Sequence, residues 1–206
     1  MSCWALVALK APAAAKGRLS ETLNASERSR LVALMFDHVL HALRAAQSIA
    51  GIAVVTADAL QVEGVAVLAD PGRGLNEALA HGAQELAARG VDELLVLHAD
   101  LPLVTGVEID QLVAAGREHG LAIAPDKLGQ GTNALYVPLP VPFSFHFGAD
   151  SCRLHLAEAA RLTKPFAQIA LPGLAFDVDE PQDLEHLLAA DHDRYRFLND
   201  ALQRCA

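Results

Sequence analysis

Short, continuous apolar runs alternate along the chain with longer segments in which apolar residues recur at helical spacing. A short apolar run is typical of a strand that is buried on both faces of a sheet. The pattern predicts strands over residues 4–9, 52–55, 65–68, 94–97, 121–124, 134–137 and 166–171. It predicts a first helix with Ser26 as its N-cap, and further helices over 76–88, 107–116, 151–162 and 181–190.

This alternation predicts an α/β fold, a mostly parallel, Rossmann-like sheet with helices on both faces. With 206 residues and no internal repeat or linker, we expect a single domain over residues 1–206. A proline-rich loop is expected over 137–142, and a last helix packed on the body over 191–205. Ligands of such sheets bind at the carboxyl ends of the strands. The polar residues at those predicted ends are Lys10, Asp58, Asp70, Asp100, Asp126 and Asp177.

Composition narrows the classes of function. The chain has 16 Lys and Arg against 25 Asp and Glu, a net charge of −9, which excludes a general nucleic-acid surface. The three cysteines form no Cys-x-x-Cys pair, so a zinc or thioredoxin-like site has no support and a reducing compartment is expected. The apolar start has no signal-peptide pattern, and no apolar run is long enough to span a membrane. We therefore expect a cytoplasmic protein without a membrane or nucleic-acid partner.

Two segments near the predicted strand ends carry groups suited to phosphates or a nucleobase. Lys10, Lys16 and Arg18 fall in one loop of an otherwise acidic chain, where they could stabilise phosphoryl transfer or form an ordinary solvated loop. In Gly72–Asn76, glycines permit close backbone approach and Asn76 offers a donor and an acceptor to a purine edge. The alternative is a turn in which Asn76 caps a helix. Neither a dinucleotide fingerprint nor a P-loop motif is present.

Acidic residues at two predicted strand ends suggest a magnesium site. Asp100 follows a buried apolar strand, where it could bind a hard cation or cap the next segment. Asp177 and Asp179 are two residues apart, so in an extended segment both carboxylates point to one side. Like charges at that distance favour an intervening cation, although Asp179 could instead complement a helix N-terminus before Pro181.

Two further segments could bind an anion. Gly129–Asn133 is a glycine-rich turn that can direct N–H groups at an anion, or a plain hairpin turn. Phe147–Ser151 precedes a predicted helix, whose N-terminus is a possible anion site or an ordinary cap. His155 lies close to this site, whereas His38 and His41, at i and i+3, are more simply explained as packed or surface residues. No Gly-x-Ser-x-Gly elbow indicates a covalent mechanism.

The order of these motifs resembles one known family. A Lys-x5-Lys-x-Arg-Leu loop is followed by Val-Val-Thr-x-Asp, Gly-Leu-Asn, Ala-Asp-Leu-Pro, Gly-x-Gly-Thr-Asn-Ala-Leu, Phe-Gly-x-x-Ser and Asp-Val-Asp-x-Pro-x-Asp-Leu. From Ala5 to about Leu187 the chain resembles the CofC family, the guanylyltransferases of coenzyme F-420 biosynthesis, which belong to the wider nucleotide-diphospho-sugar transferase-like fold. The resemblance implies transfer of GMP from GTP to 2-phospho-L-lactate, phosphoenolpyruvate or 3-phospho-D-glycerate, with release of pyrophosphate.

The resemblance also implies roles for individual residues. Those implied to bind Mg²⁺ are Asp100, Asp177 and Asp179, and those implied to act on the phosphates are Lys10, Lys16, Arg18 and the metal-bound Asp100. The guanine or ribose would lie at Gly74, Leu75 and Asn76. The acceptor's carboxylate and phosphate would contact Gly131, Thr132, Gly148 and Ser151.

The chain departs from the family pattern at Ala8, where a proline is expected, and at Asp150, which adds an acid near an anion site. A molybdopterin-type nucleotidyltransferase of the same fold is an alternative, but the glycine-rich first loop of those enzymes is missing. A nucleotide-binding relative without turnover is another, disfavoured by the three retained carboxylates. A homodimer is expected only because closed two-fold dimers are the commonest assemblies.

Overall fold

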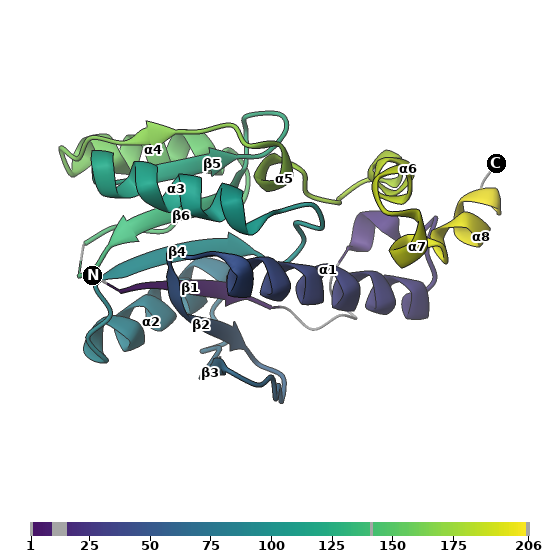
Figure 1. The fold of residues 1–206 in the computed structure, drawn as a ribbon, viewed down its shortest axis with the longest axis horizontal. Coiled ribbons are helices and arrows are strands. Elements are labelled where there is room, and N and C mark those ends of the chain that lie inside the picture. The colour runs from purple at the N-terminus through teal and green to yellow at the C-terminus, as the bar shows by residue number, and fades with distance from the viewer. Residues whose placement is uncertain (1, 10–15, 141, 205–206) are drawn as a thin grey trace.

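The structure is a computed structural model that describes residues 2–9, 16–140 and 142–204. Its described strands form one sheet in the order β3-β2-β1-β4-β6-β5-β7 (Figure 1). Their bounds are β1 Cys3–Ala8, β2 Ile49–Thr56, β3 Val65–Ala69, β4 Glu93–His98, β5 Ala122–Pro125, β6 Thr132–Pro138 and β7 Ala167–Gln168. Every neighbouring pair is parallel except that β6 runs antiparallel to both β4 and β5. The predicted mostly parallel α/β sheet is therefore confirmed.

The helices cover both faces of this sheet, as the sequence predicts. Apart from a short 3-10 helix, η2 (Gly17–Leu19), they are α1 Ala25–Ala45, α2 Leu75–Ala88, α3 Gly106–His119, α4 Ser151–Arg161, α5 Pro172–Ala175, α6 Pro181–Ala190, α7 His192–Tyr195 and α8 Leu198–Gln203. One apolar core joins the sheet to α1, α3 and α5. A second core joins the other face to α2 and α4. Within the described part of the chain, no helix is long and apolar enough to cross a bilayer.

A third core lies beyond the sheet, where the first half of α1 projects outward beside η2 and α6–α8 (Figure 1). Leu31 and Met35 of α1 pack there against Leu19 of η2 and against Tyr195 and Leu198 of the last two helices. We call this cluster of η2, the first half of α1 and α6–α8 the helical lobe. The lobe brings η2 and the first half of α1 next to the last three helices, at the opposite end of the molecule from the start of β1 (Figure 1).

Three local predictions need correction. The N-cap of α1 is Asn24 rather than Ser26, because Asn24 and Glu27 form a reciprocal capping box that satisfies two backbone N–H groups. The single helix expected over 191–205 is two short helices, because the hydrogen bond from Asn199 N to Arg196 O (3.2 Å) closes a tight turn between them. The strand expected over 166–171 pairs only at Ala167–Gln168, and the unexpected α5 follows it.

Candidate active site

A cavity of about 280 Å³ opens at the carboxyl ends of β1 and β4, where the fold predicts a ligand site. Its polar wall is formed by Lys16, Asp100 and Asp179. Apolar side chains from α1 and α2 form the opposite side, including Val32, Met35, Leu75 and Leu79. The cavity thus joins an apolar surface to a charged cluster, a combination typical of small-molecule sites.

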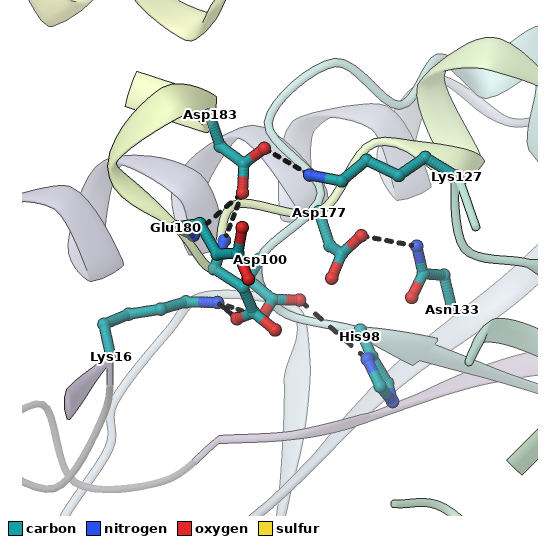
Figure 2. A network of polar contacts seen from close by, with 9 residues as sticks. Lys16, His98, Asp100, Lys127, Asn133, Asp177, Glu180 and Asp183 are labelled. Carbon is teal, nitrogen blue, oxygen red and sulfur yellow. Dashed lines mark hydrogen bonds and ion pairs between the residues drawn. The ribbon is translucent and has the colours of Figure 1, made fainter. Parts of the chain in front are cut away.

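Lys16 is the cation at the centre of the charged cluster (Figure 2). Its Nζ lies 2.5 Å from Asp100 Oδ2 and 2.8 Å from Asp179 Oδ1, and its side chain is only 7% exposed. Burial lowers the pKa of Lys16, but the two carboxylates outweigh burial and leave that pKa raised. The backbone of Lys16 is left-handed, with φ of 58°, a conformation that costs a non-glycine residue about 1 kcal/mol. Its ion pairs hold the residue in that conformation.

The three carboxylates predicted to bind a metal lie close together in this cluster, but their surroundings differ in how far they neutralise the negative charges. Burial raises the pKa of Asp100, and the neighbouring Lys16 outweighs burial and leaves that pKa lowered. The pKa of Asp177 is raised, first by burial and then by the charges of Asp100 and Asp179. Asp177 Oδ1 accepts a long hydrogen bond of 3.4 Å from Asn133 Nδ2. Lys16 therefore pairs with Asp100 and Asp179, whereas the described contact of Asp177 is with an amide.

The cluster also contains an unused acceptor. Asp100 Oδ1 is buried and has no hydrogen-bond partner among the described residues, although His98 Nδ1 lies 3.9 Å away. Within residues 2–9, 16–140 and 142–204, no group of three or more His, Cys, Asp or Glu side chains has an arrangement that could hold a metal ion. Three convergent carboxylates with an unpaired oxygen are nevertheless the donor set that a hard divalent cation prefers.

Asp183 holds the segment that carries Asp177 and Asp179. Its Oδ2 accepts hydrogen bonds from Asp179 N (2.9 Å) and Glu180 N (2.8 Å), and its other oxygen pairs with Lys127 (Figure 2). Burial raises the pKa of Asp183, but these contacts outweigh burial and leave the pKa lowered. Sequence reasoning missed this residue. An Asp at the third position of a helix that begins with Pro181 was the available signal.

The second half of the site is built where β6 begins. The register between β5 and β6 shifts there. Ala124 pairs with Ala134 and Pro125 pairs with Thr132, so Asn133 is the extra residue of a β-bulge. Such a bulge redirects side chains. Thr132 turns toward His155 of α4, and Asn133 turns toward α5, where its Nδ2 donates to Leu174 O at 3.0 Å.

The predicted acceptor residues come together at this point. The hydrogen bond from Cys152 N to Gln130 O, 3.0 Å long, ties the turn before Gly131 and Thr132 to the first turn of α4. That helix begins with Ser151, which is buried, after Gly148, whose φ of 130° favours glycine. Gly131, Thr132, Gly148 and Ser151 therefore lie around one end of α4.

Residues 142–148 form an extended segment that is held by side chains rather than by a strand. Ser144 N donates to Glu158 Oε1 at 2.9 Å, and His146 N donates to His155 Nε2 at 2.9 Å. The three alternate phenylalanines of the segment, Phe143, Phe145 and Phe147, are buried in the second core. Sequence reasoning missed this segment, although its period-two alternation was a readable signal.

Asn76 fastens the end of that segment to α2. Its Oδ1 accepts from Phe147 N at 2.7 Å, and its Nδ2 donates to Phe147 O at 3.0 Å. Both ends of the amide that we expected at the guanine or ribose are therefore bonded to backbone. Gly74 is the N-cap of α2, and Leu75 lines the cavity.

We expect Asn76→Ala to lower the free energy of unfolding by about 2 kcal/mol, because two buried backbone groups of Phe147 lose their partners. Thermal denaturation measures this loss. Asn199→Ala in α8 is the matched control, since its side-chain contact with His192 is exposed. Equal stability of the two variants would contradict the role assigned to Asn76.

Three other residues singled out in the sequence are not part of the cluster as described. Lys10 lies outside the described residues, so its predicted role stays a prediction. Arg18 is exposed on η2 and has no ion-pair partner within the described part of the chain. His38 Nε2 lies 2.8 Å from Val104 O, a contact that holds α1 against the loop before α3.

Comparisons with known proteins identify the family of the chain. A family model described as "Guanylyl transferase CofC like" matches residues 3–201. The chain is 42% identical to a phosphoenolpyruvate guanylyltransferase of Sphaerobacter thermophilus, over 91% of this chain and 93% of that protein. It is 39% identical to a protein of the same name from Chloroflexus aurantiacus, over 83% of this chain and 87% of that one.

Solved structures support the fold. A protein of Desulfovibrio desulfuricans assigned as a nucleotide-diphospho-sugar transferase superimposes with a TM-score of 0.72 at 17% identity, covering 96% of this chain and 99% of that one. A CMP-2-keto-3-deoxy-manno-octonic acid synthetase in complex with CTP gives a TM-score of 0.57 at 13% identity, covering 94% and 99%. The match over nearly all of the described chain, together with the relatives' identity, shows that this nucleotidyltransferase belongs to the CofC-like guanylyltransferase family.

Proposed function

We propose that the protein transfers GMP from GTP to the phosphate of a small phospho-carboxylic acid and releases pyrophosphate. Phosphoenolpyruvate is the first candidate acceptor, because relatives of 36–42% identity carry that name. The other candidates are 2-phospho-L-lactate and 3-phospho-D-glycerate, and coenzyme F-420 biosynthesis is the proposed pathway. The observation that supports this function is the cluster of Lys16, Asp100 and Asp179 at the cavity, with Asp177 beside it.

We further propose that Asp100, Asp177 and Asp179 hold Mg²⁺. Three carboxylates near one another, one with an unpaired buried oxygen, suit this ion. When bound, Mg²⁺ would neutralise charge on the reacting phosphates and help to orient them.

The chain's own residues then position the reactants. Lys16 is expected to exchange its carboxylate contacts for phosphate oxygens, since its ammonium already lies at the cavity wall. The N-terminus of α4 and the Thr132 hydroxyl are the groups that we expect to bind the anionic acceptor. A phosphate is already a nucleophile at neutral pH, so the reaction needs no general base, and alignment of the two phosphates supplies much of the rate.

The test is direct. The purified protein is incubated with GTP and Mg²⁺ and with each phospho-acid separately, and mass spectrometry detects the GDP-linked adduct while a coupled assay detects pyrophosphate. We expect an adduct with at least one acid. A parallel set with CTP tests a molybdopterin-type cytidylyl transfer. Magnesium-dependent GTP binding without adduct or pyrophosphate would indicate a relative that binds but does not turn over, and would overturn the proposal.

A further inference from the structure

The imidazole ring of His155, on α4, is held by packing and by polar contacts on both of its nitrogens. Its side chain is fully buried. The ring lies between Phe147, with centroids 4.7 Å apart and edge-on, and Phe143, with centroids 5.9 Å apart. Both ring nitrogens make polar contacts, one with the segment 142–148 and one with Thr132 at the start of β6.

The contact with the segment fixes the tautomer of the ring. His146 N lies 2.9 Å from His155 Nε2. A backbone N–H can only donate, so Nε2 must offer its lone pair. In a neutral imidazole the proton then lies on Nδ1. The ring consequently donates from Nδ1 to Thr132 Oγ1, 3.0 Å away.

This direction has a consequence for Thr132. Its oxygen is used as an acceptor by His155, so its own O–H proton is left to donate elsewhere. Thr132 lies at the bulge of β6, beside Gly131 and close to the first turn of α4, where the proposed acceptor binds. A hydroxyl oxygen that already accepts a hydrogen bond leaves fewer orientations to its own proton, so less entropy is lost when that proton is donated to an anion.

We propose that His155 is a positioning residue of the acceptor site: its Nδ1–H turns the Thr132 hydroxyl into a directed donor to the phospho-acid. This inference rests on the proposed function and adds to it a residue that does not touch the substrate. The relay runs from His146 N through the imidazole ring to Thr132 and then to the acceptor.

Burial supports a neutral ring. Burial lowers the pKa of His155 to about 4, with further lowering by His146 and His98 and an opposing effect of Glu158. These are the titratable side chains that face it. A second ring proton would also replace the lone pair that His146 N requires. The relay should therefore keep one direction through the neutral pH range.

Nuclear magnetic resonance of ¹⁵N-histidine-labelled protein tests the tautomer without substrate. We expect His155, assigned by loss of its signals in His155→Gln, to show a protonated Nδ1 and an unprotonated Nε2 from about pH 5.5 to 8.5. An Nε2–H tautomer, or a ring that becomes charged within that range, would overturn the relay.

Kinetics test the role. In His155→Leu both contacts are lost, and we expect the KM for the phospho-acid to rise roughly 10-fold while the KM for GTP changes less than about 2-fold. His155→Gln can accept from His146 N and donate to Thr132, so it should recover most of the affinity. In a Thr132→Val background, His155→Leu should add less than about 2-fold.

The contrary results are distinct. Equal rises in both KM values, or no recovery in a folded His155→Gln, would indicate that His155 only stabilises the fold. A full additional effect in the Thr132→Val background would show that His155 acts by another route. If the unaltered protein forms no adduct with any phospho-acid, the proposed function fails and the acceptor role of His155 fails with it. The resonance experiment still decides whether the ring directs Thr132.

Discussion

Asp177→Asn is expected to reduce nucleotidyl transfer by about 10³-fold or more, while the protein remains folded. The change removes one of the three proposed Mg²⁺ ligands and keeps the shape of the side chain. Asparagine can still contact the Asn133 side chain, so the local packing is preserved. Turnover is measured by adduct formation, and metal affinity by Mn²⁺ titration.

The same change is expected to raise the stability of the metal-free protein. The pKa of Asp177 is raised in the folded state, by burial and by Asp100 and Asp179. A raised pKa means that ionisation opposes folding, so the neutral amide removes a cost that is present at neutral pH. The advantage should disappear as the pH falls below the ordinary aspartate value of 3.8, where the native carboxyl is also neutral in both states.

Thermal unfolding at several pH values checks this prediction, with Asp193→Asn as control. Asp193 lies on α7 with a fully exposed side chain, so the same chemical change there should alter neither stability nor turnover. Near-normal turnover of Asp177→Asn would show that Asp177 is not a metal ligand. A lower melting temperature than that of the unaltered protein would contradict the charge argument.

Lys16→Met should destabilise the metal-free protein by about 2 to 3 kcal/mol, because it leaves two carboxylates without their shared cation. This loss is smaller than the roughly 3 to 5 kcal/mol usual for a fully buried ion pair. The reason is that Asp100 is 26% and Asp179 47% exposed, so water screens part of the repulsion. Addition of Mg²⁺ should restore most of the stability, because the ion can take over the neutralisation. Turnover should remain low, since Lys16 is also proposed to contact the phosphates.

Thermal unfolding with and without Mg²⁺ measures this effect. Lys164→Met is the matched control, because Lys164 is exposed and lies in the turn after α4. Its stability should not change, with or without the ion. If Lys16→Met is equally unstable in the presence and absence of Mg²⁺, the ammonium and the metal do not compete for the same carboxylates.

The order of strands and helices could be predicted from the sequence because burial imposes a local pattern. Continuous apolar runs such as Leu94–Leu97 become central strands, and Asp100 follows directly at the carboxyl end. The place of Asp100 therefore needs only periodicity and topology. Asp177 and Asp179 were expected at a strand end as well, but they follow α5, so their approach to Asp100 depends on how the segment between α5 and α6 packs.

Other features depend on contacts between residues far apart in the sequence, which no local pattern of residues predicts. The bulge at Thr132 and Asn133 arises from register with β5, and it decides which face each side chain reaches. Lys16 reaches Asp100 and Asp179 because η2, which follows it, packs against the other helices of the helical lobe. Asn76 looked free to read a base, but its contact with Phe147, 71 residues away in sequence, uses both ends of the amide.

The helical lobe also constrains when the protein can become active during its synthesis. The ribosome releases the sheet strands β1–β6 and Asp100 well before Asp177 and Asp179. Until then the projecting half of α1 has not met Tyr195 and Leu198, its later partners. A nascent chain that has released β1–β6 therefore still exposes an apolar helix surface and holds only Asp100 of the three carboxylates. Docking of the last helices would cover that surface and complete the acidic cluster in one step, so chains whose synthesis stops early should be recognised by chaperones rather than compete for nucleotide.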